Sequence, residues 1–429
     1  MEFKRTIFLA AAVCTLCSLA GCASEDKKTE YEDFLPQSTV TTEEKTTSSG
    51  SETTVSQDKN DNAPATDILY SFDDITKGLT YDGDSIWVNE KPEYKALTDI
   101  LTEECKKTKS NKGVYMFASD DEIIFVAGMN SKEADGETPV NPYTTYEAGG
   151  FSTVVTAVAI YQLEEAEKLK LTDTVDKYLP EYEYGSSITI YDLLYGKSGL
   201  YDYLSSPKAF WGDAYDSFGG EFNKRLENDE ITDEEFMEAL NVSGFKHEPG
   251  GTVANCTTDM HILAMIIEKI TGESYSEYVK KNIFDVCGME HTSSMAVGDL
   301  TSVPDPEMGG DAVVIEMPNT LRGVWDIHSC SADMLSFDRA LMHDKLISFD
   351  SREKFFTPEK GYAINYACGF YCRDNEYVCA GGEQSYMMID HIMTGTDFGN
   401  LYFIDLESSL RGHFVGENIL RRIPEQLKK

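Results

Sequence analysis

Strand-like sequence lies at both ends of the folded part of this chain, and helix-like sequence fills the region between them. Residues 113–118 and 123–128 are apolar runs joined by the acidic turn Ser119-Asp120-Asp121-Glu122, which is typical of a β-hairpin. Residues 361–382 and 399–406 return to strand-like character near the C-terminus. We therefore expect an α+β fold in which the two terminal segments share one sheet.

Three segments between or beside these strands have helical periodicity. Residues 92–108 place apolar side chains on one face, and residues 152–168 form a longer apolar helix. A third helix is expected at residues 259–271, where Gly272 follows in the position of a C-terminal cap. The folded region is expected to begin near Asp67 and to form one domain over residues 67–429.

The N-terminus has the pattern of an export signal. Lys4 and Arg5 precede an apolar run over residues 7–19 that is too short to remain as a membrane span. The following Leu19-Ala20-Gly21-Cys22 resembles the lipobox of bacterial lipoproteins. We expect residues 1–21 to be a signal peptide and Cys22 to be acylated, anchoring the protein to the outer face of the bacterial cytoplasmic membrane by lipid alone. The alternative is an ordinary secretory signal with a chance cysteine.

Composition limits the partners and the cofactors. Residues 22–66 are rich in Ser, Thr and acidic residues with almost no aliphatic ones, and we expect a disordered tether there. The formal net charge of −38 disfavours nucleic acid and anionic membrane surfaces but allows a basic protein partner. His and Cys residues show no metal-ligand spacing, so neither a metal nor another cofactor is predicted.

Seven cysteines remain after the signal and the lipidated residue are set aside, and an odd number leaves at least one unpaired. Export permits disulfides without requiring them, so their pairing stays open. They are Cys105, Cys256, Cys287, Cys330, Cys368, Cys372 and Cys379.

From about Gly113 to Leu406 the sequence resembles the serine β-lactamase and penicillin-binding-protein superfamily, close to its class C β-lactamase and DD-peptidase-like branch. The resemblance implies an antiparallel sheet formed by the N- and C-terminal segments, flanked by helices, with a helical lobe inserted between them. The stretches that carry it are Thr156-Ala157, residues 169–175, 178–181 and 192–194, Ser198-Gly199-Leu200, Pro249-Gly250, residues 266–272, Cys287-Gly288-Met289 with Thr292, and Ser331-Ala332-Asp333-Met334.

The resembled enzymes use a nucleophilic serine on the first turn of the central helix and a lysine three residues later, on the same helix face. Counting back from Thr156-Ala157, the serine place is Gly150 and the lysine place is Thr153. Glycine cannot form an acyl-serine, and threonine carries no amine. Ser152 would be rotated by about 200° from the cleft, so we expect its hydroxyl to cap backbone N–H groups of the helix instead.

The other two motifs of the family are also altered. A tyrosine and an asparagine two residues apart relay protons and orient substrate in the family, and their places are held here by Asn255 and Thr257. The third motif is a lysine or histidine, any residue and a glycine on a strand. Here Cys379 replaces the cation and Gly381 is retained.

We therefore interpret the chain as a pseudoenzyme, because members of such a catalytic unit act together. Its cleft, with Gly150, Thr153, Asn255, Thr257 and Cys379 around it, would be neutral and small-sided. It could hold a peptidoglycan peptide or a basic protein partner.

Two alternatives remain. One is an active esterase, peptidase or β-lactamase with relocated chemistry, most sharply with Cys379 as nucleophile, although that cysteine could instead pack as a small apolar residue or pair with Cys372 or Cys256. The other is a structural domain with a vestigial cleft.

An aromatic segment follows Ser198-Gly199-Leu200, consisting of Tyr201, Tyr203, Phe210 and Trp211. It could form a binding wall beside the cleft, or it could pack as loop core.

Overall fold

The computed structural model describes residues 71–107, 112–129, 132, 138–217, 222–227, 229–294, 319–361, 365–381, 386–408, 419 and 422. The predicted signal peptide, the predicted acylation site Cys22 and the predicted tether lie outside these residues. None of the described helices is long and apolar enough to cross a membrane.

The predicted sharing of one sheet by the two ends of the chain is confirmed. Within the described residues the large sheet has nine antiparallel strands in the order β1-β2-β4-β3-β12-β11-β10-β9-β8. The strand bounds are β1 Thr80–Gly83, β2 Ile86–Val88, β3 Gly113–Ser119, β4 Ile123–Met129, β8 Asn365–Ala367, β9 Phe370–Arg373, β10 Glu376–Gly381, β11 Tyr386–Thr396 and β12 Gly399–Ser408. Strands β3 and β12 join the two halves, and their pairing brings Phe117 opposite Phe403.

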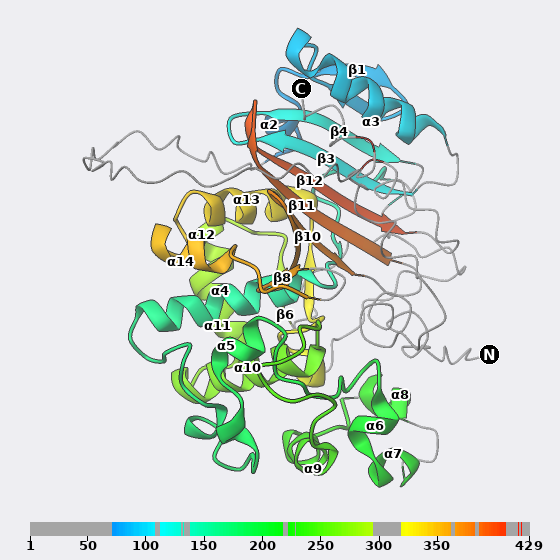
Figure 1. Ribbon diagram of the computed structural model, residues 1–429. Coiled ribbons are helices and arrows are strands. Elements are labelled where there is room, and N and C mark those ends of the chain that lie inside the picture. Colours follow the sequence, from blue (N-terminus) through cyan, green and yellow to red (C-terminus); the bar gives the residue numbers. More distant parts are fainter. Residues whose placement is uncertain are drawn as a thin grey trace, which may run out of the picture.

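The helical residues between β4 and β8 form a second layer and a lobe below the sheet (Figure 1). The α-helices are α2 Phe72–Thr76, α3 Lys95–Lys107, α4 Phe151–Glu165, α5 Ile190–Leu194, α6 Pro207–Trp211, α7 Asp213–Ser217, α8 Phe222–Glu227, α9 Asp233–Ser243, α10 Thr257–Thr271, α11 Tyr275–Val279, α12 Asp285–Cys287, α13 Ser331–Met342 and α14 Phe349–Phe355. A small sheet, in the order β5-β7-β6, joins β5 Tyr146–Glu147, β7 Ile327–Ser329 and β6 Ser293–Ser294.

The hairpin and the three helices that were predicted lie close to their expected positions, and the strands near the C-terminus were predicted less well. Strands β3 and β4 pair as expected, and α10 ends at Thr271 with Gly272 in the left-handed conformation of a C-terminal cap. The segment 361–382 contains three short strands rather than one run, and β1, β2 and β11 were not predicted. Asp390 and His391 interrupt the apolar pattern of β11, although both side chains are buried.

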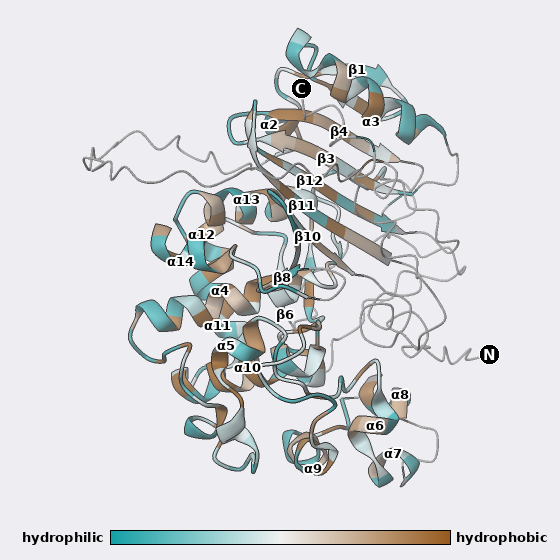
Figure 2. Cartoon of the chain, viewed as in Figure 1, coloured by the Kyte–Doolittle hydropathy of each residue, from teal (hydrophilic) through white to brown (hydrophobic). Residues whose placement is uncertain are grey.

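Helix α4 lies at the centre of the molecule, between the sheet and the lobe (Figure 1). It is apolar on every side, and apart from Gln162 and the last two glutamates its side chains are buried. It contacts α10 on the side of the lobe and β10 on the side of the sheet. Figure 2 shows brown and pale residues over α4 and the central strands, and more teal on the outer helices. The start of α4 is therefore held rigidly against one strand.

Candidate functional site

The first turn of α4 meets β10 almost backbone to backbone. A Cβ atom added at Gly150 would lie 3.2 Å from the Cys379 Sγ and 3.2 Å from the Ala380 carbonyl oxygen. A Cβ added at Gly381 would lie 3.0 Å from the Gly150 backbone nitrogen. The structure thus brings Gly150, Cys379 and Gly381 together, as their assigned motif places require.

Thr153, at the lysine place, is also in a crowded position. It is buried, and its hydroxyl donates a hydrogen bond of 2.7 Å to the Gly150 carbonyl oxygen. The turn between β8 and β9 lies against it, because a Cβ at Gly369 would be only 2.6 Å from the Thr153 Oγ1. Gly369 has a φ of +97°, which favours glycine as strongly as the contact does. A lysine side chain at position 153 would have to displace this turn.

Asn255, at the tyrosine place, contacts phenols that come from the sheet. Its Nδ2 donates to the Tyr371 hydroxyl oxygen at 3.1 Å, and the Tyr366 hydroxyl donates to its Oδ1 at 3.3 Å. Burial raises the pKa of Tyr366 well above its ordinary range, so this phenol stays protonated at neutral pH. These two tyrosines, on β8 and β9, were not predicted as site residues, and only their spacing within the strand-like segment could have suggested them.

Thr257, at the asparagine place, is bound within the protein. Both its backbone N–H and its hydroxyl donate to the Asp202 Oδ2, each at 2.7 Å. The backbone N–H groups of Leu204 and Ser205 donate to the other oxygen of this carboxylate. Thr257 therefore anchors the loop after Leu200 rather than facing a ligand.

Cys379 lies in an environment that opposes thiolate formation. The side chain is 1% exposed, and burial together with Asp390 and Asp338 raises the pKa of the thiol well above its usual range. Asp390 lies directly opposite on β11, and Asp338 faces it from α13. A nearby carboxylate disfavours a thiolate, whereas a reactive cysteine needs a cation or a base.

All seven cysteines of the described residues are free and buried, so Cys379 pairs with neither Cys372 nor Cys256 in this structure. It packs as a small apolar residue.

Ser152, the neighbour of Thr153, bonds to a distant part of the chain. The Ser152 hydroxyl does not cap its own helix: it accepts hydrogen bonds of 3.2 Å from the backbone N–H groups of Asp326 and Ile327. These two N–H groups lie more than 170 residues further along the chain, so no local pattern could reveal the contact. Ser152 is fully buried, so the prediction that it is not a nucleophile agrees with its environment.

The aromatic segment is loop core rather than a binding wall. Tyr203, Phe210 and Trp211 are almost completely buried, and Phe236 packs edge-on against Tyr203. Tyr201 is half-buried and packs against the same cluster. The more ordinary of the two interpretations is confirmed.

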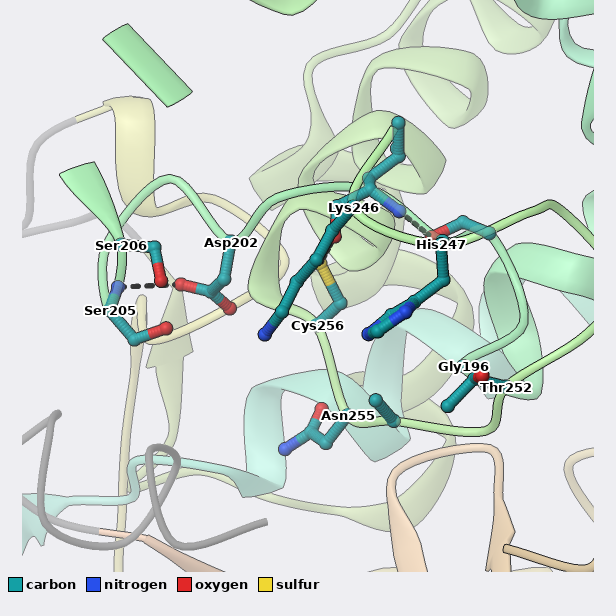
Figure 3. A pocket seen from close by; sticks show the side chains of 13 residues that line it. Gly196, Asp202, Ser205, Ser206, Lys246, His247, Thr252, Asn255 and Cys256 are labelled. Carbon is teal, nitrogen blue, oxygen red and sulfur yellow. Dashed lines mark hydrogen bonds between the residues drawn. The ribbon is translucent and has the colours of Figure 1, made fainter. Parts of the chain in front are cut away.

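A cavity of about 50 Å³ with a mixed polar and apolar lining opens beyond Asn255 (Figure 3). Its lining includes Asp202, Lys246, His247 and Asn255, together with four hydroxyl residues, Ser198, Ser205, Ser206 and Thr252. The neutral, small-sided pocket expected around Gly150, Thr153, Asn255, Thr257 and Cys379 is not this cavity, whose lining shares Asn255 with that set. The positions of Lys246 and His247, just before the matching Pro249-Gly250, were the available signal.

The chain matches a known protein family over most of its length. The family model for β-lactamase matches residues 99–391. The chain belongs to the β-lactamase family. Among curated relatives, PbpX of Bacillus subtilis (strain 168), provisionally named a penicillin-binding protein, is 30% identical over 270 residues, covering 62% of this chain and 63% of PbpX. A second penicillin-binding protein of that organism is 29% identical, with 59% of its length matched. The match thus spans about three fifths of each relative.

Solved structures of other proteins share the fold. A penicillin-binding protein from Bacillus halodurans superposes with a TM-score of 0.61 at 19% identity, covering 77% of this chain and 99% of the other. FmtA from Staphylococcus aureus gives a TM-score of 0.57 at 20% identity, covering 83% and 95%. The D-amino acid amidase of Ochrobactrum anthropi gives 0.61 at 15% identity, covering 78% and 98%. At these identities the similarity establishes the β-lactamase-like fold of this family member and nothing finer.

Proposed function

We propose that this β-lactamase-family protein is a non-acylating binding protein, exported and lipid-anchored through Cys22, whose ligand is a cell-wall peptide. The observation that carries the proposal is the contact of β10 and the β8–β9 turn with Gly150 and Thr153. The nucleophile and its lysine are not only missing. Neighbouring atoms also occupy the space beside Gly150 and Thr153, so that a single substitution would not restore the catalytic serine or its lysine.

The chemistry that remains suits hydrogen bonding rather than covalent catalysis. Asn255 is an amide, which neither accepts nor releases a proton near neutral pH. Its two phenol partners are buried, and burial keeps Tyr366 protonated. A relocated reaction at Cys379 is disfavoured, because the thiol is inaccessible and two carboxyl groups raise its pKa.

A peptide ligand is favoured over a basic protein partner at this site. The lining of the cavity beyond Asn255 includes the Lys246 ammonium, which would repel a basic group. Relatives of this chain are named penicillin-binding proteins, which supports a cell-wall ligand class while leaving the activity of this chain to experiment.

Covalent labelling is the direct test. The exported domain is incubated with a fluorophosphonate and, separately, with penicillin, and its intact mass is measured. No mass increase is expected with either reagent. Isothermal titration with purified cell-wall peptides should show reversible binding. A stoichiometric adduct on any residue would overturn the non-acylating assignment, and the absence of binding to every cell-wall peptide would overturn the ligand assignment.

A further inference from the structure

The far end of the helical lobe carries apolar side chains that the fold leaves exposed. Helix α9 lies at that end, away from the large sheet (Figure 1). Val242 in its last turn is 78% exposed, and Tyr184 on a neighbouring loop is 41% exposed. The partly buried ring of Phe245 packs edge-on against Tyr184, with 5.8 Å between the ring centroids. We call Tyr184, Val242 and Phe245 the lobe patch.

The side chain of Asn241 holds the two parts of the lobe patch together. Its Nδ2 donates to the Glu181 carbonyl oxygen at 3.0 Å, and its Oδ1 accepts from the Glu183 N–H at 2.8 Å. These two bonds fix the loop of Tyr184 against the last turn of α9, where Val242 lies. The exposed apolar side chains are therefore arranged before a partner arrives, which lowers the entropic cost of binding.

Carboxylates surround the lobe patch. Glu234 and Glu238 are exposed and share a face of α9 with Val242, because the three residues are spaced four apart. Glu181 and Glu183 are exposed on the neighbouring loop. Within the part of the chain that the structure describes, none of these four carboxylates forms an ion pair, whereas the other two acidic residues of α9 are paired with arginines. The patch thus lies in a negative field that no neighbouring ion pair reduces.

We infer that the lobe patch docks a lysine- or arginine-rich segment of another protein, which packs an apolar side chain against Tyr184 and Val242. Exposed apolar residues rimmed by charged ones mark interaction sites, and opposite charge in the partner favours its encounter with this face. Lys246 follows Phe245 in the chain, but its side chain extends into the cavity beyond Asn255 (Figure 3). The inference is separate from the ligand proposed for the cleft.

Other occupants fit this surface less well. A second copy of the chain would bring its own carboxylates against these four, and each copy carries a net charge of −38. Nucleic acid and anionic lipid are repelled for the same reason. The segment 22–66 of this chain is itself acidic. Arg422, near the C-terminus, bonds to Glu103 and Glu104 on α3, which lies at the sheet end of the molecule (Figure 1).

The apolar part of the surface is tested with two synthetic helical peptides. One is a repeat of lysine and leucine, and the other has alanine at every leucine position, so that the charge is the same. Fluorescence anisotropy measures the binding of each peptide to the full chain. The lysine–leucine peptide should bind at least about tenfold more tightly, and Tyr184→Ser with Val242→Ser should remove most of this difference. Phe349→Ser, which removes a 55% exposed aromatic ring on α14, is the matched control and should leave binding unchanged.

The acidic rim is tested by removing charge without changing shape. Glu181→Gln with Glu183→Gln should weaken binding of the lysine–leucine peptide by about threefold or more at low salt, and high salt should abolish the effect. Glu90→Gln with Glu93→Gln is the matched control, because it removes two exposed carboxylates far from α9 and changes the net charge equally. The control should bind as the unmodified protein does.

Equal weakening in the rim variant and its control would overturn the inference, because the peptide would then follow the net charge alone. Unchanged binding in the patch variant would overturn it as well. Val242→Ser by itself, at a largely exposed position, gives the same comparison if the double variant fails to fold. Sedimentation of the protein without peptide addresses a second copy. A dimer that Val242→Ser dissociates would assign the lobe patch to self-association and overturn the basic partner.

Discussion

Gly150 lacks the hydroxyl of a catalytic serine, and strand β10 also occupies the space beside it. The Cys379 Sγ and the Ala380 carbonyl oxygen would both lie 3.2 Å from a Cβ atom added at Gly150. The same contact explains why Cys379 is inert, since it is sealed between α4 and the carboxyl groups of Asp338 and Asp390. The two residues are complementary: a small residue at one position accommodates a buried thiol at the other.

Restoring the hydroxyl alone should fail for this reason. Gly150→Ser is expected to give no adduct with a fluorophosphonate and to lower the free energy of unfolding by about 1–2 kcal/mol through overpacking. Urea unfolding and intact mass measure the two effects. Adding Cys379→Ala should recover part of the stability without producing an adduct. Efficient labelling of Gly150→Ser would show that Thr153 and Asn255 suffice for activation and would contradict the proposed inactivity.

At the scale of elements, the β8–β9 turn lies across the first turn of α4. Gly369 in this turn has positive φ and contacts both Thr153 and Val154. The hydrogen bonds between Asn255 and the tyrosines of β8 and β9 tie the same strands to the loop before α10. These contacts join the sheet to the helical lobe where the family's catalytic groups would meet.

Replacing Gly369 tests this packing. Gly369→Ala should cost at least about 2 kcal/mol of stability, because it combines an unfavourable φ with a clash against α4. Gly78→Ala is the matched control, since Gly78 also has positive φ but no atom within 4 Å of an added Cβ. Chemical denaturation of both variants gives the comparison. An equal loss of unfolding free energy in the two variants would mean that the turn can move away from α4 freely.

A second contact between elements makes the stability of the fold depend on pH. Asp338 on α13 and Asp390 on β11 are fully buried and face each other, and within the described residues their carboxyl oxygens have no hydrogen-bond partner apart from each other. Burial raises the pKa of Asp390 to about 7 and that of Asp338 well above its usual range. The folded pair therefore shares a proton. Arg339, Cys379 and Tyr402 are the other titratable groups that interact with this pair.

The folded state keeps Asp390 protonated up to about pH 7, whereas the unfolded chain releases this proton near pH 4. The stabilising contribution is thus complete below about pH 4 and is lost as the pH rises through about 7, by up to about 4 kcal/mol. Asp390→Asn should reduce the loss of stability between pH 5 and 8, measured by thermal unfolding. Asp344→Asn, which changes a partly exposed carboxyl outside the pair, is the control. An unchanged pH profile in Asp390→Asn would show that the pair does not hold the proton.

At the scale of the whole molecule, the acidic domain is expected to be displayed from the membrane by Cys22 and the segment 22–66. Cys22→Ser should move the protein from the detergent phase to the aqueous phase in detergent partitioning of cells that export it. Without the acyl chains of the proposed anchor, the protein would lose the apolar group that holds it in the detergent phase. Partitioning that is unaffected by the substitution would contradict the lipid anchor and favour an ordinary signal peptide.

Much of the architecture could be predicted because it rests on patterns that are local. The two apolar runs of residues 113–128 and the acidic turn between them specified the hairpin, and Gly272 specified the end of α10. The strand β11 was missed because Asp390 and His391 look incompatible with a buried strand, although a shared proton makes Asp390 tolerable there. For the site, the motif spacing brought Gly150, Cys379 and Gly381 together correctly, since each motif is short and lies on a rigid element.

Sequence alone determined the family and the absence of the reactive side chains from their motif positions, because both depend on which residues occur in which order. The tertiary structure decided which groups lie beside these altered motif positions. The Gly369 turn against Thr153 and the phenols on Asn255 come from strands more than a hundred residues away from their partners, and Asp338 reaches Asp390 and Cys379 from a helix in another layer of the fold. Contacts of this kind leave no periodic signal in the chain, and they appear only when β8–β11 close over α4 and bring Lys246 to the edge of a cavity.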